Sequence, residues 1–416
     1  MVERASIILL CIWSFWSVCC WLNGRRYRRQ YLSWKKNEDS HRPKLSSLPS
    51  AVIWAPVKGC PDQLEAYLER TLNQDYPDYK VVFCFESVSD PGFRKLRQYL
   101  AADVRQSPGL DSIQMVVAGL STDQGQKIHN LLAAYREDGG FGDVIAFVDA
   151  DSVWEENTLR LLVEGLEKNN ATLSTGYRWL IPSEQRFGAI LASTINGSIS
   201  TLLGPYWRNS AWAGAMAIRR QSFEEEDLAN VLRGRVSDDI VISDHLIRAG
   251  HKIEFCPGVT PIGWVGYNLR DCIKFGRRQY GHFWVCRRAM WFYAYAATGG
   301  YLGGWVICIL LIASGHPLAI LPAAITYIAD IALGFERRKI AQTLFPPEVT
   351  SKLRLVHVLD SFFTPLWMAV HYLVLLSTFG SRHVDWGGIR YRITRTTTAI
   401  ISRADSTDPS VADSLH

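Results

Sequence analysis

The segment DVIAFVDADS, residues 143–152, joins an apolar run to two carboxylates that are one residue apart. Its β-branched residues and Phe147 predict a buried strand of a parallel sheet. Because alternate side chains of a strand point the same way, Asp149 and Asp151 are predicted to converge just beyond the strand's carboxyl end. That edge is where open α/β sheets bind ligands. The alternative is an acidic turn that caps the next helix.

If the two carboxylates converge, they offer the hard oxygen ligands that Mg²⁺ and Mn²⁺ prefer. We therefore predict a divalent metal site at Asp149 and Asp151, with the ion in turn holding a diphosphate. The residues on either side of this segment are needed to distinguish the metal site from the capping turn.

Strand and helix patterns alternate around this segment. Strand-like runs lie at residues 51–55, 80–85, 113–117 and 173–179, and helical patterns lie around residues 64–72, 96–100 and 131–135. This alternation predicts an α/β fold with a doubly wound, mostly parallel sheet. No glycine-rich loop of the dinucleotide-binding or P-loop kind follows the first strand.

Polar side chains follow three of the predicted strands. Lys58 follows the first, Glu86 and Asp90 follow the second, and the two aspartates follow the fourth. The carboxyl ends of parallel strands share one edge of a sheet, so this convergence predicts a nucleotide site there.

Three further stretches are candidates for that site, and each has a structural alternative. Lys127 and Asn130 share a helical face after a polar loop, which is either a nucleotide contact or a solvated helix start. Trp212 and Gly214 begin a run of small residues, which either lets the backbone approach a bulky ligand or forms a core strand. The pair at residues 238–239 either caps a helix or supplies a general base for an acceptor hydroxyl.

Hydrophobic residues make up 48% of the chain and are clustered. Apolar runs lie at residues 7–22, at 362–379, and twice within 291–333, where Gly315-His316-Pro317 separates them. Each run is near the roughly 17 to 25 residues that cross a bilayer. The sequence therefore predicts an integral membrane protein with one N-terminal and about three C-terminal transmembrane or re-entrant helices.

The positions of the cations predict which side of the membrane is cytoplasmic. Arginines at positions 25, 26, 28 and 29 follow the first run, which places the cytoplasm on that side. Because this cluster abuts a span, we expect anionic lipid headgroups, and not nucleic acid, beside it. Residues 269–290 interleave arginines with aromatic rings, a pattern typical of an interfacial helix. Four full spans would leave the basic C-terminal region outside, so either the last run or the run with Asp330 is predicted to re-enter.

These patterns divide the chain into six parts. They are an anchor at residues 1–24, a basic linker at 25–50, a soluble domain at 51–268, an interfacial helix at 269–290, membrane helices at 291–380, and a basic motif with a polar tail at 381–416. Within the soluble domain we expect a helix over residues 186–203. The tail is expected to be disordered from residue 396 on.

Several motifs, taken in order, resemble the membrane-bound inverting glycosyltransferases of family 2, and most closely their ceramide glucosyltransferase branch. The resemblance covers residues 51–392 and rests on PVKG (56–59), DYPDY (75–79), FCFESVSDP (83–91), DAD (149–151), DD (238–239) and WGGIRYR (386–392). It implies a GT-A-like nucleotide-sugar domain, with Asp149 as the family's second aspartate and with Asp239, beside Asp238, as the base.

The resemblance also implies an activity. One hexose, glucose in this branch, would pass from a UDP-sugar to a lipid hydroxyl such as that of ceramide or diacylglycerol, with Mg²⁺ or Mn²⁺ as cofactor. The nucleotide sugar would contact a set of polar residues and Gly214, whereas Trp212 would lie on the acceptor side; the polar set is Lys58, Glu86, Asp90, Lys127, Asn130 and Asp149. The catalytic domain would face the cytoplasm from a bacterial inner membrane or a eukaryotic Golgi or ER membrane.

Two positions depart from the family pattern. Ser87 stands where the family has its first aspartate, so uridine recognition would rest on Glu86 or Asp90. The segment QYGHF, residues 279–283, matches the family's (Q/R)-x-x-R-W motif with His for Arg and Phe for Trp. The motif implies Gln279 and His282 at the diphosphate and Phe283 and Trp284 on the acceptor side, with either Arg277 or Arg278 as the replacement charge.

Two other functions remain open at this stage. A polysaccharide synthase or a polyprenyl-phosphate sugar transferase would use the same sheet, although about three spans after the catalytic domain are few for a chain-extruding channel. A membrane protein that binds a UDP-sugar without turnover would account for His282, whereas the two acidic pairs argue against it.

Overall fold

The computed structural model describes residues 2–37, 48–102, 106–167, 170–203, 209–212 and 214–403. The chain divides into two compact units. The membrane unit comprises Met1–Lys36, Leu180–Leu202 and Val265–Ser381, and the sheet unit comprises Asn37–Trp179, Leu203–Trp264 and Arg382–His416. Residues 25–37 of the expected basic linker (25–50) are not a linker, because they continue the helix α1 (Val2–Asn37) that begins in the expected anchor. The part of the linker at residues 38–47 and the tail beyond residue 403 lie outside the described residues.

This division departs from the linear order expected from the sequence. The predicted helix near residues 186–203 is α6 (Phe187–Ser200), and it belongs to the membrane unit although it was expected in the soluble domain. Residues 382–403, expected to be a basic motif and a polar tail, belong to the sheet unit. The chain therefore passes between the units several times, and neither unit is one continuous stretch.

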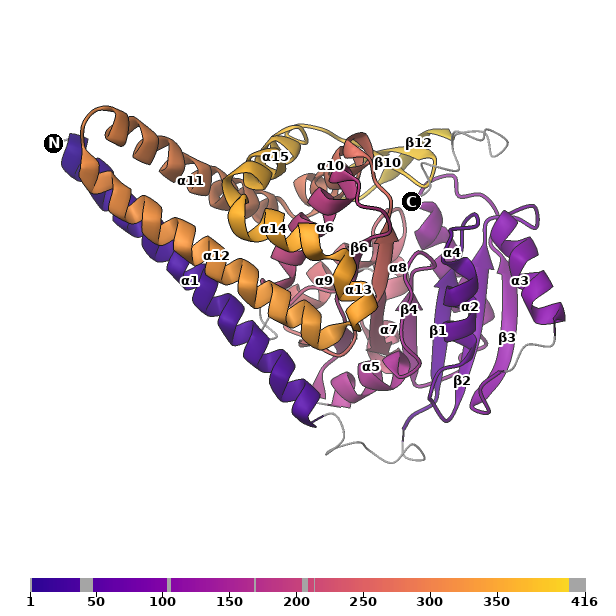
Figure 1. Cartoon of the computed structure of the whole chain (residues 1–416). Helices are drawn as coiled ribbons and strands as arrows, with labels where there is room; N and C mark the ends of the chain where they lie inside the picture. The colour runs from indigo at the N-terminus through magenta and orange to yellow at the C-terminus, as the bar shows by residue number, and fades with distance from the viewer. Residues whose placement is uncertain are drawn as a thin grey trace. The chain divides into compact units, whose positions relative to one another are not determined.

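The sheet unit is built on a seven-stranded sheet (Figure 1). Its strands, in their order across the sheet, are β3 (Leu110–Val117), β2 (Tyr79–Phe85), β1 (Ala51–Pro56), β4 (Val144–Val148), β7 (Ala215–Arg219), β5 (Leu173–Thr175) and β8 (Ile253–Phe255). β1 pairs in parallel with β2 and β4, and β2 pairs in parallel with β3, whereas β7 is antiparallel to both of its neighbours. The predicted α/β fold with a mostly parallel sheet is confirmed.

Trp54 lies at the centre of the core that holds β1 against β4. Its indole packs edge-on against Phe147 and Phe223, with ring centroids 5.2 and 5.4 Å away. The indole N–H donates to the carboxylate of Asp138 at 3.0 Å, and the guanidinium of Arg220 lies 2.8 Å from the same oxygen. A buried indole whose N–H is hydrogen-bonded contributes a large apolar area and leaves no unpaired donor. Trp54 therefore holds β1 and β4 together, and site residues follow the ends of these strands.

Seven helices in the described residues connect these strands. They are α2 (Leu64–Leu72), α3 (Pro91–Ala101), α4 (Gln126–Glu137), α5 (Thr158–Glu167), α7 (Arg220–Glu225), α8 (Leu228–Leu232) and α9 (Asp238–Arg248). The strand predicted over residues 173–179 is divided, because the backbone changes partners at Gly176. The N–H of Gly176 donates to Ala215, whereas the N–H of Tyr177 donates to Val259. The next strand, β6 (Trp179–Pro182), pairs instead with β9 (Ile262–Val265).

A second, three-stranded sheet ends the described chain. It consists of β10 (His383–Trp386), β11 (Ile389–Ile393) and β12 (Thr398–Arg403), and it is antiparallel throughout. The expectation of disorder from residue 396 on is wrong for residues 398–403. β-branched residues at three positions of β12 suit a strand, and pairing with β11 outweighs the polar residues around them.

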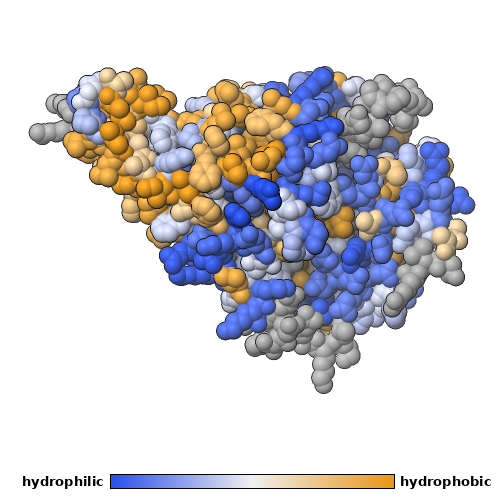
Figure 2. Space-filling view, in the orientation of Figure 1, coloured by the Kyte–Doolittle hydropathy of each residue, from blue (hydrophilic) through white to orange (hydrophobic). Residues whose placement is uncertain are grey.

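The membrane unit contains α1 (Val2–Asn37), α6, α10 (Leu269–Cys286), α11 (Arg288–Ala313), α12 (Ile320–Leu344), α13 (Pro347–Lys352), α14 (Arg354–Phe362) and α15 (Thr364–Leu376). Among the described residues, three stretches are long and apolar enough to cross a membrane: Ser6–Lys36, Arg288–Ala313 and Pro317–Leu344. Figure 2 shows hydrophobic residues gathered over α1, α11 and α12, where Phe15, Ile309 and Leu321 are exposed. This surface is the kind that lipid tails cover.

Ion pairs join the charged ends of these helices. Arg28 on α1 pairs with Glu336 on α12, so the basic end of α1 lies beside the C-terminal half of α12. Arg337, the next residue on α12, lies 2.5 Å from Asp360 on α14. Of the two runs that were candidates to re-enter, the run with Asp330 forms the continuous helix α12. The last run instead follows a sharp break, because α14 and α15 are bent by 91° relative to each other.

Candidate active site

Three charged side chains from distant parts of the sheet unit form a buried cluster. The Nζ of Lys127 lies 2.5 Å from Oδ1 of Asp149 and 2.9 Å from Oδ2 of Asp238. Lys127 is in the first turn of α4, Asp149 directly follows β4, and Asp238 is the first residue of α9. The side chains of Lys127, Asp149 and Asp238 are 14%, 16% and 3% exposed. The structure thus brings together three of the predicted site residues, around an ammonium group.

Burial and mutual attraction set the charges of this cluster. Burial alone would lower the pKa of the Lys127 ammonium, but the carboxylates of Asp149, Asp238 and Asp239 hold that pKa above its usual value. Burial raises the pKa of Asp149 and of Asp238, and Lys127 opposes the rise. A carboxylate at this depth needs a nearby cation to remain ionised, so Lys127 is the counter-charge for both.

Asp239 lies beside the cluster and is only half-buried. Its Oδ1 accepts hydrogen bonds from the hydroxyl of Ser237 at 2.5 Å and from the backbone N–H of Ile240 at 2.7 Å. Asp239 is the second residue of α9, so its side chain lies in the first turn of that helix. Its Oδ2 accepts no hydrogen bond from any residue that the structure describes, which leaves this oxygen available as a proton acceptor.

Asp151 contacts a different cation. β4 ends at Val148, and the next residues form a turn in which the N–H of Ser152 donates to the carbonyl of Asp149 at 3.1 Å. Strand alternation therefore does not extend to the two aspartates. Oδ1 of Asp151 lies 2.6 Å from Nη1 of Arg178, and its side chain is 41% exposed. The capping alternative does not apply to either aspartate, because α5 begins only at Thr158.

The carboxylates of Asp149 and Asp151 are the donors available at the predicted metal site. No group of three or more His, Cys, Asp or Glu side chains that could hold a metal ion is found among the described residues. Mg²⁺ is commonly held by one or two carboxylates, with substrate phosphates and water completing its shell. Asp151 is partly exposed, and Asp149 is its near neighbour in the turn. The residues therefore fit an ion shared with a diphosphate, and they do not fit a site made by protein ligands alone.

An ion pair and hydrogen bonds connect the loops after β1 and β2. Nζ of Lys58 lies 2.8 Å from Oε2 of Glu86. Asp90 is the N-cap of α3, where Oδ1 accepts from the N–H of Gly92 at 2.7 Å and both carboxylate oxygens lie 3.1 Å from the N–H of Gly59. Asp90 therefore has a structural role, and its contact with uridine stays a prediction, as do those of Lys58 and Glu86.

Asn130, Gly214 and Trp212 have structural contacts in the sheet unit. The amide of Asn130 donates to the carbonyl of Cys84 at 3.3 Å and accepts from Gln126 at 2.9 Å, which joins α4 to β2. Gly214 has a φ of +115°, which disfavours other residues there, and it adjoins Arg178 and Ser152. The Trp212 ring meets Tyr177 edge-on, with centroids 5.2 Å apart. The predicted contacts of the three residues with donor or acceptor stay predictions.

The QYGHF motif lies on α10, in the membrane unit. Burial, with a smaller contribution from Arg278, lowers the pKa of His282 to about 3, so its imidazole is neutral at pH 7. The Arg278 guanidinium lies 5.2 Å from the centre of the Phe275 ring. The parts assigned to Gln279, His282, Arg278, Phe283 and Trp284 in a nucleotide-sugar site stay predictions.

Sequence reasoning missed Arg178, a single cation between Tyr177 and Trp179 in an otherwise apolar stretch. It also assigned no role to the C-terminal sheet, although WGGIRYR was one of the motifs quoted for the family. The hydroxyl of Tyr391 accepts from the backbone N–H of Gln126, the first residue of α4, at 3.2 Å. Arg403 donates to the carbonyl of Ser121 at 2.5 Å.

The same sheet also holds the segment before α9. Thr398 Oγ1 donates to the carbonyl of Gly234 at 2.8 Å, and the N–H of Gly125 donates to the carbonyl of Arg235 at 2.7 Å. We call Tyr391, Thr398 and Arg403 the C-terminal clamp. The clamp fixes both segments that lead into the ion cluster, one before Lys127 and one before Asp238.

Comparisons with known proteins agree with the motifs. The model of the family described as Glycosyl transferase family 21 matches residues 15–399. The ceramide glucosyltransferase of Komagataella phaffii (strain GS115 / ATCC 20864) is 27% identical over 115 residues, which are 27% of this chain and 21% of that protein. The match therefore spans about a fifth of the relative's length.

A solved structure is also similar. It is the mannosyltransferase PcManGT from Pyrobaculum calidifontis in complex with GDP-Man and Mn²⁺, with 14% identity, a TM-score of 0.47, and coverage of 91% of this chain and 98% of that one. The family match spans most of the sequence and includes both acidic pairs and the WGGIRYR motif. The resemblance to the ceramide glucosyltransferase branch is therefore confirmed, and the chain belongs to glycosyl transferase family 21.

Proposed function

We propose that this glycosyltransferase moves a single hexose, glucose in the first instance, from a UDP-sugar to the hydroxyl of a membrane lipid such as ceramide or diacylglycerol. The observation that carries the proposal is the cluster of Lys127, Asp149 and Asp238, with Asp239 beside it. The ceramide glucosyltransferase relative supports the choice of sugar and acceptor. Three helices suited to a bilayer support a lipid as the acceptor.

In this proposal Asp239 is the general base. Its half-buried carboxylate keeps Oδ2 open and is fixed through Oδ1, so it is positioned to remove the proton of an incoming hydroxyl. The oxygen freed of its proton attacks the anomeric carbon from the side opposite to the UDP, in one displacement that inverts the configuration. Asp238 and Lys127 hold the start of α9 in place.

The leaving diphosphate gains negative charge in this step, so cations beside it contribute most to the rate. Lys127 and Arg178 are the basic groups beside Asp149 and Asp151. Asp149 and Asp151 would hold Mg²⁺ or Mn²⁺ together with the diphosphate, and a bound divalent ion would neutralise part of the charge of the leaving group.

We place the sheet unit on the cytoplasmic side of the membrane. The basic end of α1 lies beside Glu336 of α12, and cytoplasmic ends of spans are enriched in cations. Crossings by α1, α11 and α12 return the chain to that side. The strands β10–β12 that follow belong to the sheet unit, so α14 and α15 re-enter and do not cross.

The test of Asp239 is an assay for transfer in membranes with UDP-glucose and a ceramide acceptor. Asp239→Asn should reduce transfer by roughly 10²–10⁴-fold, the contribution of a general base, and leave UDP binding nearly unchanged. The matched control is Asp244→Asn on the same helix, where the carboxylate pairs with Arg248 at 2.7 Å. Equal transfer by Asp239→Asn and the wild type would remove Asp239 from the role.

A second candidate is a membrane protein that binds a UDP-sugar without turnover. The neutral His282, at the position where the family has an arginine, is the observation that favours it. Expression in a host without glycolipids, followed by mass spectrometry of the lipids, separates the candidates. A new monohexosyl lipid supports the transferase, longer chains support a polysaccharide synthase, a glycosylated polyprenyl phosphate supports that class of transferase, and UDP-glucose binding without product supports the binder.

A further inference from the structure

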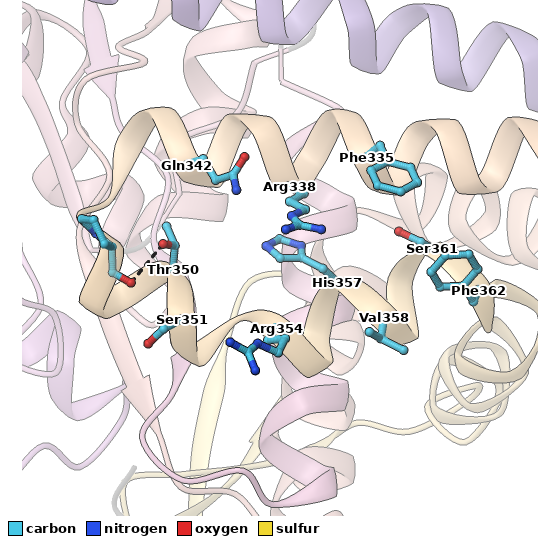
Figure 3. Close-up of a pocket in the computed structure, with 11 residues that line it drawn as sticks. Phe335, Arg338, Gln342, Thr350, Ser351, Arg354, His357, Val358, Ser361 and Phe362 are labelled. Atoms are coloured by element: carbon cyan, nitrogen blue, oxygen red, sulfur yellow. Dashed lines mark hydrogen bonds between the residues drawn. The ribbon is translucent and has the colours of Figure 1, made fainter.

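A pocket of about 310 Å³ lies in the membrane unit, between the C-terminal half of α12 and the short helices α13 and α14 (Figure 3). This volume is at the lower end of the roughly 300 to 1,000 Å³ that is usual for small-molecule sites. Its polar lining residues include Arg338, Gln342, Ser351, Arg354 and His357. None of the residues that the sequence indicated for the nucleotide site lines it.

Two cations of the pocket have no counter-charge among the residues that the structure describes. Neither Arg338 nor Arg354 forms an ion pair or a hydrogen bond with any residue in the described part of the chain. The neighbouring Arg337, in contrast, lies 2.5 Å from Asp360. Nε2 of His357 is buried and likewise has no hydrogen-bond partner among the described residues. The pocket therefore has donors for an anion and no acidic residue in its lining.

The opposite end of the pocket is apolar. Figure 3 shows Arg338 and His357 pointing toward one another from facing helices, whereas Phe335 and Phe362 lie together at one end. Phe335 and Phe362 are each 43% exposed. Along α12, Phe335 lies on the side of Arg338 that leads back into the apolar span. The pocket is thus cationic around Arg338 and apolar at the end that lies toward the apolar part of α12.

We propose that this pocket binds the phosphate headgroup of an anionic membrane lipid, with the acyl chains passing Phe335 and Phe362. The proposal rests on the membrane placement given above. A guanidinium binds a phosphate through two parallel hydrogen bonds, and basic pockets beside membrane helices bind such headgroups. A neutral lipid alcohol, the proposed acceptor, would leave both guanidiniums without a partner. The bound lipid is therefore distinct from the substrate, and it joins α12 to α13 and α14.

The test uses the full-length protein in nanodiscs of phosphatidylcholine alone or of phosphatidylcholine and phosphatidylglycerol in equal parts. Native mass spectrometry counts the phosphatidylglycerol that remains bound after release from the nanodisc. Wild-type protein should retain it, and Arg338→Gln should retain it about tenfold less strongly, the loss expected for one hydrogen bond to a charged group. Arg354→Gln should also weaken retention. Lys339→Gln is the matched control, because it removes an exposed charge from the same turn of α12 outside the pocket.

Two outcomes would overturn the proposal. Equal losses in Arg338→Gln and Lys339→Gln would show general attraction of a basic surface for anionic lipid. A rise in melting temperature with inorganic phosphate alone, equal to that with phosphatidylglycerol and dependent on Arg338, would show a site for a soluble phosphate. Neither readout requires transfer of a sugar, so the test remains valid if the proposed function fails.

Discussion

Replacement of Lys127 by methionine tests the ion cluster directly. The side chain of methionine has a similar length but leaves Asp149 and Asp238 without their cation. Removing one partner of a buried ion pair costs about 3 to 5 kcal/mol, because the remaining charge is stranded. A destabilisation of 1 kcal/mol lowers the melting temperature of a domain of this size by about 2 to 4 °C. We therefore expect Lys127→Met to melt about 10 °C below the wild type at pH 8.

The sign of the pH dependence follows from the raised pKa of Asp149 and Asp238. Between the ordinary and the raised pKa, the folded state binds more protons than the unfolded state, so stability falls as pH rises. Without Lys127 the pKa of these two groups rises further, and protonation at low pH relieves the repulsion. The loss of melting temperature in Lys127→Met should therefore be smaller at pH 5.5 than at pH 8. Adding Asp238→Asn should recover part of this loss at pH 8.

The assay is thermal unfolding in detergent, followed by intrinsic fluorescence, with a chelator present so that no divalent ion replaces the ammonium. Lys95→Met is the control, because Lys95 forms an ion pair with Glu65 at the surface, at 2.9 Å. Such exposed pairs contribute about 0 to 1 kcal/mol. The reasoning is refuted if Lys127→Met and Lys95→Met have the same melting temperature at pH 8. It is also refuted if the melting temperature of Lys127→Met lies equally far below that of the wild type at both pH values.

Three further changes test other contacts. Tyr391→Phe removes a hydrogen bond worth about 0.5 to 1.5 kcal/mol, and steady-state kinetics should show transfer slowed about two- to tenfold with no fall in expression. Arg337→Met strands Asp360 and should cost about 3 to 5 kcal/mol in thermal melts, whereas a double change with Asp360→Asn should recover most of it. Hydrogen bonds from His251 and His245 lower the pKa of Glu226, so Glu226→Gln should be less stable than the wild type at pH 7, with the difference lost as pH falls through that lowered pKa.

The fold was largely predictable because its signals are local. The apolar run before Asp149 and the alternating helices specify parallel strands without reference to distant residues. The helix predicted over residues 64–72 is α2, with the same ends. The helix over 187–200 was misplaced because its small apolar residues suit both a soluble core and a membrane unit.

The site was predictable only in part, because side-chain partners depend on tertiary contacts. Lys127 and Asp149 could be named from their neighbourhoods, but their direct ion pair could not. Asp151 was expected beside Asp149 on the basis of strand alternation, whereas the chain forms a turn after Val148, and the contact of Asp151 with Arg178 could not be foreseen from alternation. The role of Tyr391 depends on β11 and β12 reaching the start of α4, and nothing local to the motif encodes that contact.

The position of the C-terminal clamp in the chain has a consequence for biosynthesis. A ribosome synthesises Tyr391, Thr398 and Arg403 after every membrane helix that the structure describes. During translation, the segments before Lys127 and Asp238 can therefore form these hydrogen bonds only after the hydrophobic segments have left the ribosomal exit tunnel. Completion of the reaction centre is thereby timed to follow delivery of the nascent polypeptide to its bilayer.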